Sequence, residues 1–535
     1  MKILTSIAAA MLIVFSANIF ADNNKAILIQ AGSNNMAATI QDPSTHNNLI
    51  IQAQFGTSHD SDAAQITGTS HSVATHLQVG ELNTSESLQS DNTSLSSILI
   101  NQAGSSNGAG VFQAEVTTSS AFANQAGSMN QAEVVQEEGV LGSIAFINQV
   151  GSLNGAEVFQ EEVTASGVFV NQAGSLNEAG VAQEKGVVAS IAFINQVGSM
   201  NGAGVVQEEV TASDAFVNQA GSMNLAFVGQ AMVTASGAFV NQAGSMNEAF
   251  VGQGDVTASS AFINQAGSMN EAFVGQGEGL VASIASVNQA GSINVAVIDQ
   301  LMATTSSVFV NQAGSMNQAL VGQVEGVVAS IISVNQAGSM NMAEVSQEGV
   351  TASGAFVNQL GSINEAGIEQ EVGTVLSVAI INQIGEMNEA DIEHEDATVL
   401  SIANINQAGE MNDAFIEQDD AIASAAIINQ AGTTNEADII QEDGPIVASF
   451  AIINQIGEMN EAEILQEDGT VLSFANINQA GSMNMADITQ TGAALSIAST
   501  TQLGSGNMHT TTQTGVGQTA IVVQIGSGNM GMIAQ

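Results

Sequence analysis

The sequence predicts an all-β protein, a β-solenoid of stacked strand-turn-strand repeats. Three observations indicate this fold: one motif recurs along nearly the whole chain, side chains inside each repeat alternate with a period of two, and glycine-containing steps separate the alternating segments. Period two is typical of β-strands, and an unbroken repeat of about two dozen residues is typical of solenoids. We therefore expect one long array in place of several globular domains.

The repeat motif is Ser-x5-Gln-x-Gly-x2-Asn-x5-Gln. The Gln of its Gln-x-Gly step occurs 22 times between Gln30 and Gln524, with a mean period of about 23.5 residues. Residues 22–95 hold the most divergent repeats, and residues 96–535 hold the regular ones. Because both regions keep the same phase, we expect one continuous array of 22 units.

The first 21 residues differ from the repeat. Lys2 precedes an apolar run from Ile7 to Ile19, and the small residue Ala21 ends the segment. This pattern is typical of a secretory signal peptide cleaved before Asp22, and the apolar run is too short to span a membrane. We expect residues 1–21 to be a signal peptide and the remaining chain to be exported, with no transmembrane segment.

Composition excludes several classes of partner. The formal net charge is −48, and the only basic residues are Lys2, Lys25 and Lys185. Such a chain repels nucleic acid and anionic membranes. It has no Cys, so stacking must stabilise the array without disulfides. Richness in Asn, Gln, Ser and Gly also fits a disordered prion-like tract, but such a tract has no reason to keep its apolar residues in phase.

Each repeat contains two alternating segments, which we interpret as strands. One alternating set stays small or apolar from repeat to repeat and should face the core. In one repeat it comprises Ser143, Ala145, Ile147, Gln149, Asn154, Ala156, Val158 and Gln160. The step Ala243–Met246 inside a repeat and the step Glu467–Gly469 between repeats are expected to be turns, because Gly adopts backbone angles that other residues avoid.

Buried Gln and Asn need partners inside the protein, because they lose their hydrogen bonds to water. Identical amides repeated every ~4.8 Å along a stack can bond to one another, as in cross-β ladders. We therefore interpret the fixed motif positions as ladder residues and not as ligands. In three well-preserved repeats they are Ser143, Gln149, Gly151, Asn154, Gln160, Ser236, Gln242, Gly244, Asn247, Gln253, Ser259, Gln265, Gly267, Asn270 and Gln276.

Phenylalanine recurs at one outward position, three residues after the motif Ser. Stacking would make it an exposed aromatic stripe, which a soluble monomer rarely shows without a partner. One hypothesis is lateral packing of fibrils through this stripe, and the alternative is simple stabilisation by stacked rings. The stripe is predicted at Phe122, Phe146, Phe169, Phe193, Phe216, Phe239 and Phe262.

Acidic residues occupy another outward position in five successive repeats. At a spacing of ~5 Å, neighbouring carboxylates repel by about 1 kcal/mol in water before salt screening. This repulsion either delays premature aggregation during export or simply keeps the surface soluble. The residues are Glu365, Glu389, Asp413, Glu436 and Glu461.

The sequence shows no catalytic, cofactor or metal motif. The six His have no metal-ligand spacing, and the recurrent Ser faces the core without a His and Asp set. Glu161 and Glu162 form a carboxylate pair in a turn, where acid-base catalysis would need a cleft. We therefore expect neither an enzyme nor a cofactor-binding protein.

The ends of the array indicate assembly. The first repeat begins close to the predicted cleavage site, and the last closes at Gln535. Soluble solenoids usually carry polar caps, whereas unpaired edge strands template the addition of another chain. With no cap at either end, we expect end-to-end growth into a filament.

The five fixed motif positions resemble the curlin repeat of bacterial curli fibre subunits, over essentially the whole chain after residue 21. The resemblance implies a functional amyloid, secreted to the bacterial surface as the subunit of an adhesive, fimbrium-like fibre in biofilm matrix and surface attachment. It also implies a nucleating curlin subunit, an outer-membrane export pore and accessory chaperones as partners. The chain departs from the family in its 22 repeats and in lacking a short targeting segment after the signal peptide.

The sequence thus favours a structural subunit that polymerises with copies of itself. The alternative is a soluble monomeric β-solenoid that acts as an adhesin or surface-binding module. Binding of an amyloid dye and sedimentation of the purified chain separate the two.

Overall fold

The computed structural model describes residues 23–324, 326–371, 373–393, 398–419, 421–442 and 446–535. Every regular element in these ranges is a β-strand, and the chain divides between Ala258 and Ser259 into two compact units. In the same ranges, no helix is long and apolar enough to cross a membrane. The predicted signal peptide, residues 1–21, lies outside the described residues.

In the first unit, each repeat supplies one strand to an A sheet and one to a B sheet. The ten described A strands are β1 (Lys25–Ser33), β3 (Leu49–Thr57), β5 (Val73–Glu81), β7 (Ser97–Ser105), β9 (Ser120–Ser128), β11 (Ile144–Ser152), β13 (Gly167–Ser175), β15 (Ile191–Ser199), β17 (Asp214–Ser222) and β19 (Gly237–Ser245). The ten described B strands are β2 (Met36–Gln41), β4 (Asp60–Gln65), β6 (Thr84–Ser90), β8 (Gly108–Ala114), β10 (Gln131–Glu137), β12 (Gly155–Glu161), β14 (Glu178–Glu184), β16 (Gly202–Glu208), β18 (Leu225–Ala231) and β20 (Glu248–Gly254). The short strand β21 (Val256–Thr257) follows.

The second unit repeats this arrangement. Its described A strands are β22 (Ser260–Ser268), β25 (Ile284–Ser292), β27 (Ser307–Ser315), β29 (Ile331–Ser339), β31 (Gly354–Ser362), β33 (Val378–Glu386), β35 (Ile402–Glu410), β38 (Ala425–Thr433), β41 (Phe450–Glu458), β43 (Phe474–Ser482), β45 (Ile497–Ser505) and β47 (Thr519–Ser527). Its described B strands are β23 (Glu271–Gly277), β26 (Val295–Leu301), β28 (Gln318–Gln323), β30 (Met342–Val345), β32 (Glu365–Ala366), β34 (Glu389–Ala390), β36 (Asp413–Ile416), β39 (Glu436–Glu442), β42 (Glu461–Glu467), β44 (Met485–Thr491), β46 (Met508–Gln513) and β48 (Met530–Ala534). Three two-residue strands, β24 (Leu280–Val281), β37 (Ala421–Ile422) and β40 (Ile446–Val447), lie between repeats.

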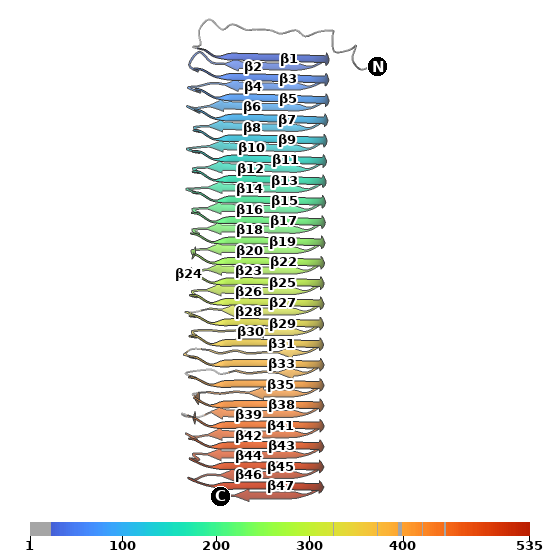
Figure 1. Ribbon diagram of the computed structural model, residues 1–535, viewed down its shortest axis with the longest axis vertical. Coiled ribbons are helices and arrows are strands. Elements are labelled where there is room, and N and C mark those ends of the chain that lie inside the picture. The colour runs from blue at the N-terminus through green and yellow to red at the C-terminus, as the bar shows by residue number, and fades with distance from the viewer. Residues whose placement is uncertain (1–22, 325, 372, 394–397, 420, 443–445) are drawn as a thin grey trace. The chain divides into compact units, whose positions relative to one another are not determined.

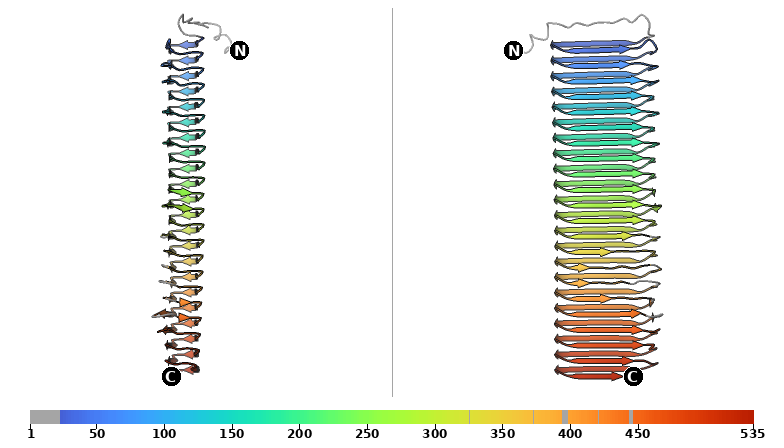
Figure 2. Two further views of the ribbon diagram at one scale, coloured as in Figure 1. Left: turned by 90° about the vertical axis from the view of Figure 1, so that its left-hand side faces the viewer. Right: turned by 180° about the vertical axis from the view of Figure 1, so that it is seen from behind.

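Strands of consecutive repeats pair in parallel and in register within each unit. In the A sheets, Gln149 pairs with Gln172 and Gln407 pairs with Gln430. Within each unit the strands stack as rungs, and the A and B strands form two layers (Figures 1 and 2). Each unit is therefore a β-solenoid, which confirms the predicted fold class.

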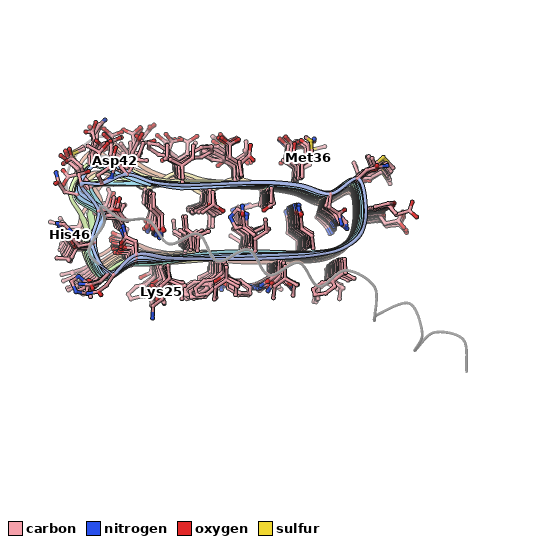
Figure 3. The ribbon with its side chains drawn as sticks, turned by 90° about the horizontal axis from the view of Figure 1, so that it is seen from above. Lys25, Met36, Asp42 and His46 are labelled. Atoms are coloured by element: carbon pink, nitrogen blue, oxygen red, sulfur yellow. The ribbon has the colours of Figure 1, made fainter. Side chains whose placement is uncertain are left out.

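The core lies between the two layers. Viewed along the stack, Lys25 points outward from the A layer and Met36 points outward from the B layer, and the alternate side chains fill the narrow space between (Figure 3). Ala145, Ile147 and Val158 are fully buried there. Full burial of an Ile or Val side chain stabilises a fold by about 1.5–3 kcal/mol, so the apolar columns are a main source of stability.

One predicted turn is misplaced. The strand β19 extends to Ser245, and the chain reverses at Met246 and Asn247, where Met246 has a left-handed φ of 55°. Gly244 therefore lies within a strand. The predicted turn at Glu467–Gly469 is present, with positive φ at Asp468 and Gly469.

The motif Gly is required by close packing of successive strands. Gly151 lies inside β11 with a φ of 126°, and a Cβ atom there would lie 1.8 Å from the carbonyl oxygen of Gly174. No side chain fits that distance, and L-residues rarely adopt that angle. The sequence pattern identified an essential Gly but assigned it to the wrong local structure.

Candidate functional site

The motif Gln side chains form columns of hydrogen bonds in the core. Gln149 Nε2 donates to Gln172 Oε1 at 2.9 Å, and it also donates to the carbonyl oxygens of Gln131 at 2.8 Å and Asn154 at 3.1 Å. The closing Gln160 donates to Gln183 Oε1 at 2.7 Å. In both columns of this unit, each amide donates toward the C-terminal neighbour.

The motif Asn side chain donates to both neighbouring rungs, and the motif Ser side chain accepts a hydrogen bond from the next rung. Asn154 Nδ2 donates to Asn130 Oδ1 at 3.0 Å, and it also donates to the carbonyl oxygen of Gly174 at 3.0 Å. Ser143 Oγ accepts a hydrogen bond from the backbone N–H of Ser166 at 3.3 Å. The Asn side chain therefore binds the backbone oxygen of the motif Gly in the next rung.

The structure places the other predicted ladder residues in equivalent columns. The first unit contains Ser236, Gln242, Gly244, Asn247 and Gln253, the second contains Ser259, Gln265, Gly267, Asn270 and Gln276, and the polar side chains among them are at most 5% exposed. Gln219 donates to Gln242 at 2.9 Å, and Gln265 donates to Gln289 at 2.9 Å. Buried amides bonded in this way hold rungs together and are not available to a ligand in solvent.

The sequence analysis missed a buried polar cluster in the first unit. His76 occupies the core position that Ile100 holds in the next repeat, and it is 1% exposed. Its Nδ1 atom lies 2.9 Å from Ser61 Oγ and 3.0 Å from Ser85 Oγ, and its Nε2 atom lies 2.7 Å from Ser87 Oγ. Burial lowers the pKa of His76 to about 4. Two successive polar residues, Gln52 and His76, in a column that elsewhere in this unit holds Ala, Val, Ile or Leu were the signal that could have revealed this cluster.

The predicted Phe stripe points outward, and its side chains are half-buried. The ring centroids of Phe122 and Phe146 are 6.1 Å apart, and those of Phe216 and Phe239 are 5.3 Å apart with nearly parallel planes. Such contacts stabilise neighbouring strands by about 0.5–1.5 kcal/mol per pair. Phe169 and Phe193 occupy the same column in the first unit, and Phe262 begins the corresponding column of the second unit.

The predicted acidic column is present in the B sheet of the second unit. Glu365 pairs in register with Glu389, and Glu389 pairs with Asp413. The neighbouring Asp413 carboxylate raises the pKa of Glu389, and burial together with nearby carboxylates raises the pKa of Asp438 to about 6. Among the described residues, no group of three or more His, Asp or Glu side chains could hold a metal ion.

Neither a protein-family model nor a curated protein matches this sequence. The resemblance to the curlin repeat therefore depends on the motif alone.

Proposed function

We propose that the chain is a secreted structural subunit of extracellular adhesive amyloid fibres of the curli type. The observation that supports this is the in-register stack within each unit. Most described rungs present their neighbours with the same backbone groups and the same core amides, as for Gln149 and Asn154. A rung of a second chain could continue the stack with identical bonds, which is how cross-β fibres grow.

The ladders give each added rung both affinity and register. A one-residue slip would place core side chains on the outer face. It would also leave the Gln and Asn amides without partners, at a cost of about 1–3 kcal/mol for each buried group. In-register addition avoids both costs, so identical chains are the best partners.

The remaining partners and the location follow from the curlin resemblance. They are a nucleating curlin subunit, an outer-membrane export pore and accessory chaperones, and the fibres lie outside the bacterial cell in biofilm matrix and at attachment surfaces. The proposed function requires neither a catalytic activity nor a cofactor.

A second candidate function is that of a soluble, monomeric β-solenoid adhesin. The observation that favours it is the outer face of the A sheet, where β9, β11 and β13 carry no charged residue and could contact a surface. The two candidates differ in whether the chain assembles.

The test is incubation of residues 22–535 in saline with thioflavin T, followed by sedimentation. We expect a lag, a rise in dye fluorescence and loss of the chain to the pellet, and preformed fibres should shorten the lag. A chain that retains its β-sheet circular dichroism but stays in the supernatant would contradict the fibre proposal and support the soluble adhesin.

A further inference from the structure

The outer faces of the two sheets differ sharply in charge in the first unit. The A strands from β7 to β19 contain one charged residue, Asp214. The B strands from β8 to β20 contain eight carboxylates, at Glu133, Glu137, Glu157, Glu161, Glu178, Glu184, Glu208 and Glu248. The A face, with its single carboxylate, is therefore the one that a second copy of this acidic chain could approach.

The outer face of these A strands has a ridge and a hollow. The ridge is the Phe column from Phe122 to Phe239, in which ring contacts join Phe122, Phe146 and Phe169 and join Phe193, Phe216 and Phe239. The hollow, about 240 Å³, lies over Ala103 and Ala126 and is bounded by Leu77 and Val79. Ala103 and Ala126 belong to the column that holds Ala or Val two residues after each outward Asn.

The outward Asn column lies between the ridge and the hollow. Asn101 donates to Asn124 at 2.9 Å, and Asn218 donates to Asn241 at 3.0 Å. Among the described residues, no hydrogen bond joins the amides of the intervening column members Asn148, Asn171 and Asn195, which are half-buried. Their amide groups are open to a partner on this face.

We propose that two copies of the chain pair through this face, which we name the pairing face: the outward side chains of the A strands from β7 to β19. The two-fold axis runs along the Asn column, parallel to the stacking direction. In the strands from β9 to β19 the Phe lies two residues before the Asn and the Ala or Val two residues after it, as in Phe169, Asn171 and Ala173, and in β7 Leu99 takes the place of the Phe. The rotation exchanges these columns, so the Phe ridge of each copy faces the column of Ala and Val residues of the other.

Electrostatics favours this arrangement over a lateral contact through a B face. Pairing face to pairing face leaves both acidic B faces on the outside. With about 10 Å between packed sheets, those faces are roughly 30 Å apart, several times the Debye length of about 8 Å at physiological salt. Contact through a B face would bring carboxylates together. The pairing adds a lateral contact to the proposed function but does not require end-to-end growth.

The absence of Cys makes the register directly testable by single-cysteine cross-linking. Asn171 lies on the proposed axis, so its copies face each other across the interface, whereas Ala182 lies on the B face of the same repeat. With a short bis-maleimide, N171C should give cross-linked dimers, and the matched A182C should give at least tenfold fewer. Equal yields from both positions, or none from N171C, would overturn the pairing.

The Phe ridge provides the second variant. In the N171C background, F146S, F169S and F193S together should lower the dimer yield about tenfold, which corresponds to about 1.4 kcal/mol. Ser occupies the corresponding column of the second unit naturally at Ser286 and Ser333, so these substitutions fit the fold. The control changes three B-face residues, F112S, F159S and F227S, and should leave the yield unchanged. Circular dichroism checks that both triple variants retain their β-sheet signal.

The outcomes separate this inference from the proposed function. If fibres form but N171C gives no cross-link, the fibre proposal is supported and the pairing is wrong. Cross-linked dimers without fibres support the pairing and contradict the fibre proposal. If N171C does not cross-link but the chain binds an insoluble neutral polysaccharide through the same Phe residues, the occupant of the face is a glycan and the pairing is wrong.

Discussion

Gln149 and Asn148 are adjacent amides with different roles. Gln149 points into the core, where its side chain donates to Gln172 and to two backbone oxygens. Asn148 points outward and is half-buried. Removing a buried partner leaves other buried groups unsatisfied, whereas an outward group can bond to water. The position of an amide in the strand therefore decides its contribution to stability.

We predict that Gln149→Ala weakens the rungs on both sides of it. Gln125 Nε2 loses the acceptor to which it donates at 2.9 Å, and Gln172 Oε1 loses its donor. The expected loss is about 2–4 kcal/mol of local stability, since two buried groups lose partners. Hydrogen exchange of β9 and β13 measures it. The outward control Asn148→Ala should change exchange little, and equal effects would contradict the ladder account.

Glycine at the motif position is predicted to tolerate no side chain. Gly151→Ala would place a Cβ atom 1.8 Å from Gly174 O, at a φ of 126°. The strand pair must separate, so β11 and β13 should lose protection from hydrogen exchange. Gly155→Ala is the matched control, because a Cβ there meets no atom within 4 Å. Preserved protection in Gly151→Ala would show that the rungs are not packed this closely.

At the scale of strands, the first unit contains a segment whose core is polar. Gln52 of β3 donates to the carbonyl oxygen of Ser61 at 2.8 Å, and Ser61 and Ser87 contact His76. Most other repeats bury Ala, Val or Ile at these positions. Polar contacts replace apolar burial here, so the stability of β3 to β8 depends on the protonation of His76.

We predict that this segment loses stability in acid. The folded chain holds the pKa of His76 at about 4, below its ordinary 6.5, so the unfolded chain binds the proton more readily. The contribution of neutral His76 to the stability of this segment is complete above pH 6.5, and about 3 kcal/mol of it is lost as the pH drops toward 4. Hydrogen exchange of β5 at pH 4.5 and 7.5, corrected for intrinsic rates, measures this loss. His76→Gln should remove it, and the exposed control His71→Gln should not.

The acidic B strands of the second unit should respond to pH in the opposite direction. The pKa of Asp438 is raised from 3.8 to about 6, so the folded chain binds the proton more readily than the unfolded chain. Protection of β36, β39 and β42 should therefore increase as the pH falls from 6 to 4. Asp438→Asn should reduce this pH dependence of protection, whereas the turn variant Asp468→Asn should leave the pH dependence unchanged. A decrease in protection toward acid would contradict the assignment.

The sequence predicted the strands well because the core positions recur in phase. Ala145, Ile147 and Val158 are buried as expected. Gly244 was assigned to a turn because Gly usually occupies turns, but here a close approach between strands requires it inside β19. His76 was missed because a period of two identifies the buried face without showing which buried residues bond across the layers.

At the scale of the whole chain, the net charge of −48 opposes assembly and the ladders favour it. Repulsion between chains is screened by salt over about 8 Å at physiological ionic strength, whereas buried amide bonds are screened much less. The balance between them should set the rate of fibre growth. Salt should accelerate assembly without changing the final structure.

X-ray fibre diffraction of residues 22–535 after incubation in saline tests the central claim most directly. Stacked rungs that continue from chain to chain should give a meridional reflection near 4.7–4.8 Å and an equatorial reflection near 10 Å, from filaments visible by electron microscopy. Discrete particles with the same β-sheet content and no oriented reflections would contradict the fibre account and leave a soluble β-solenoid.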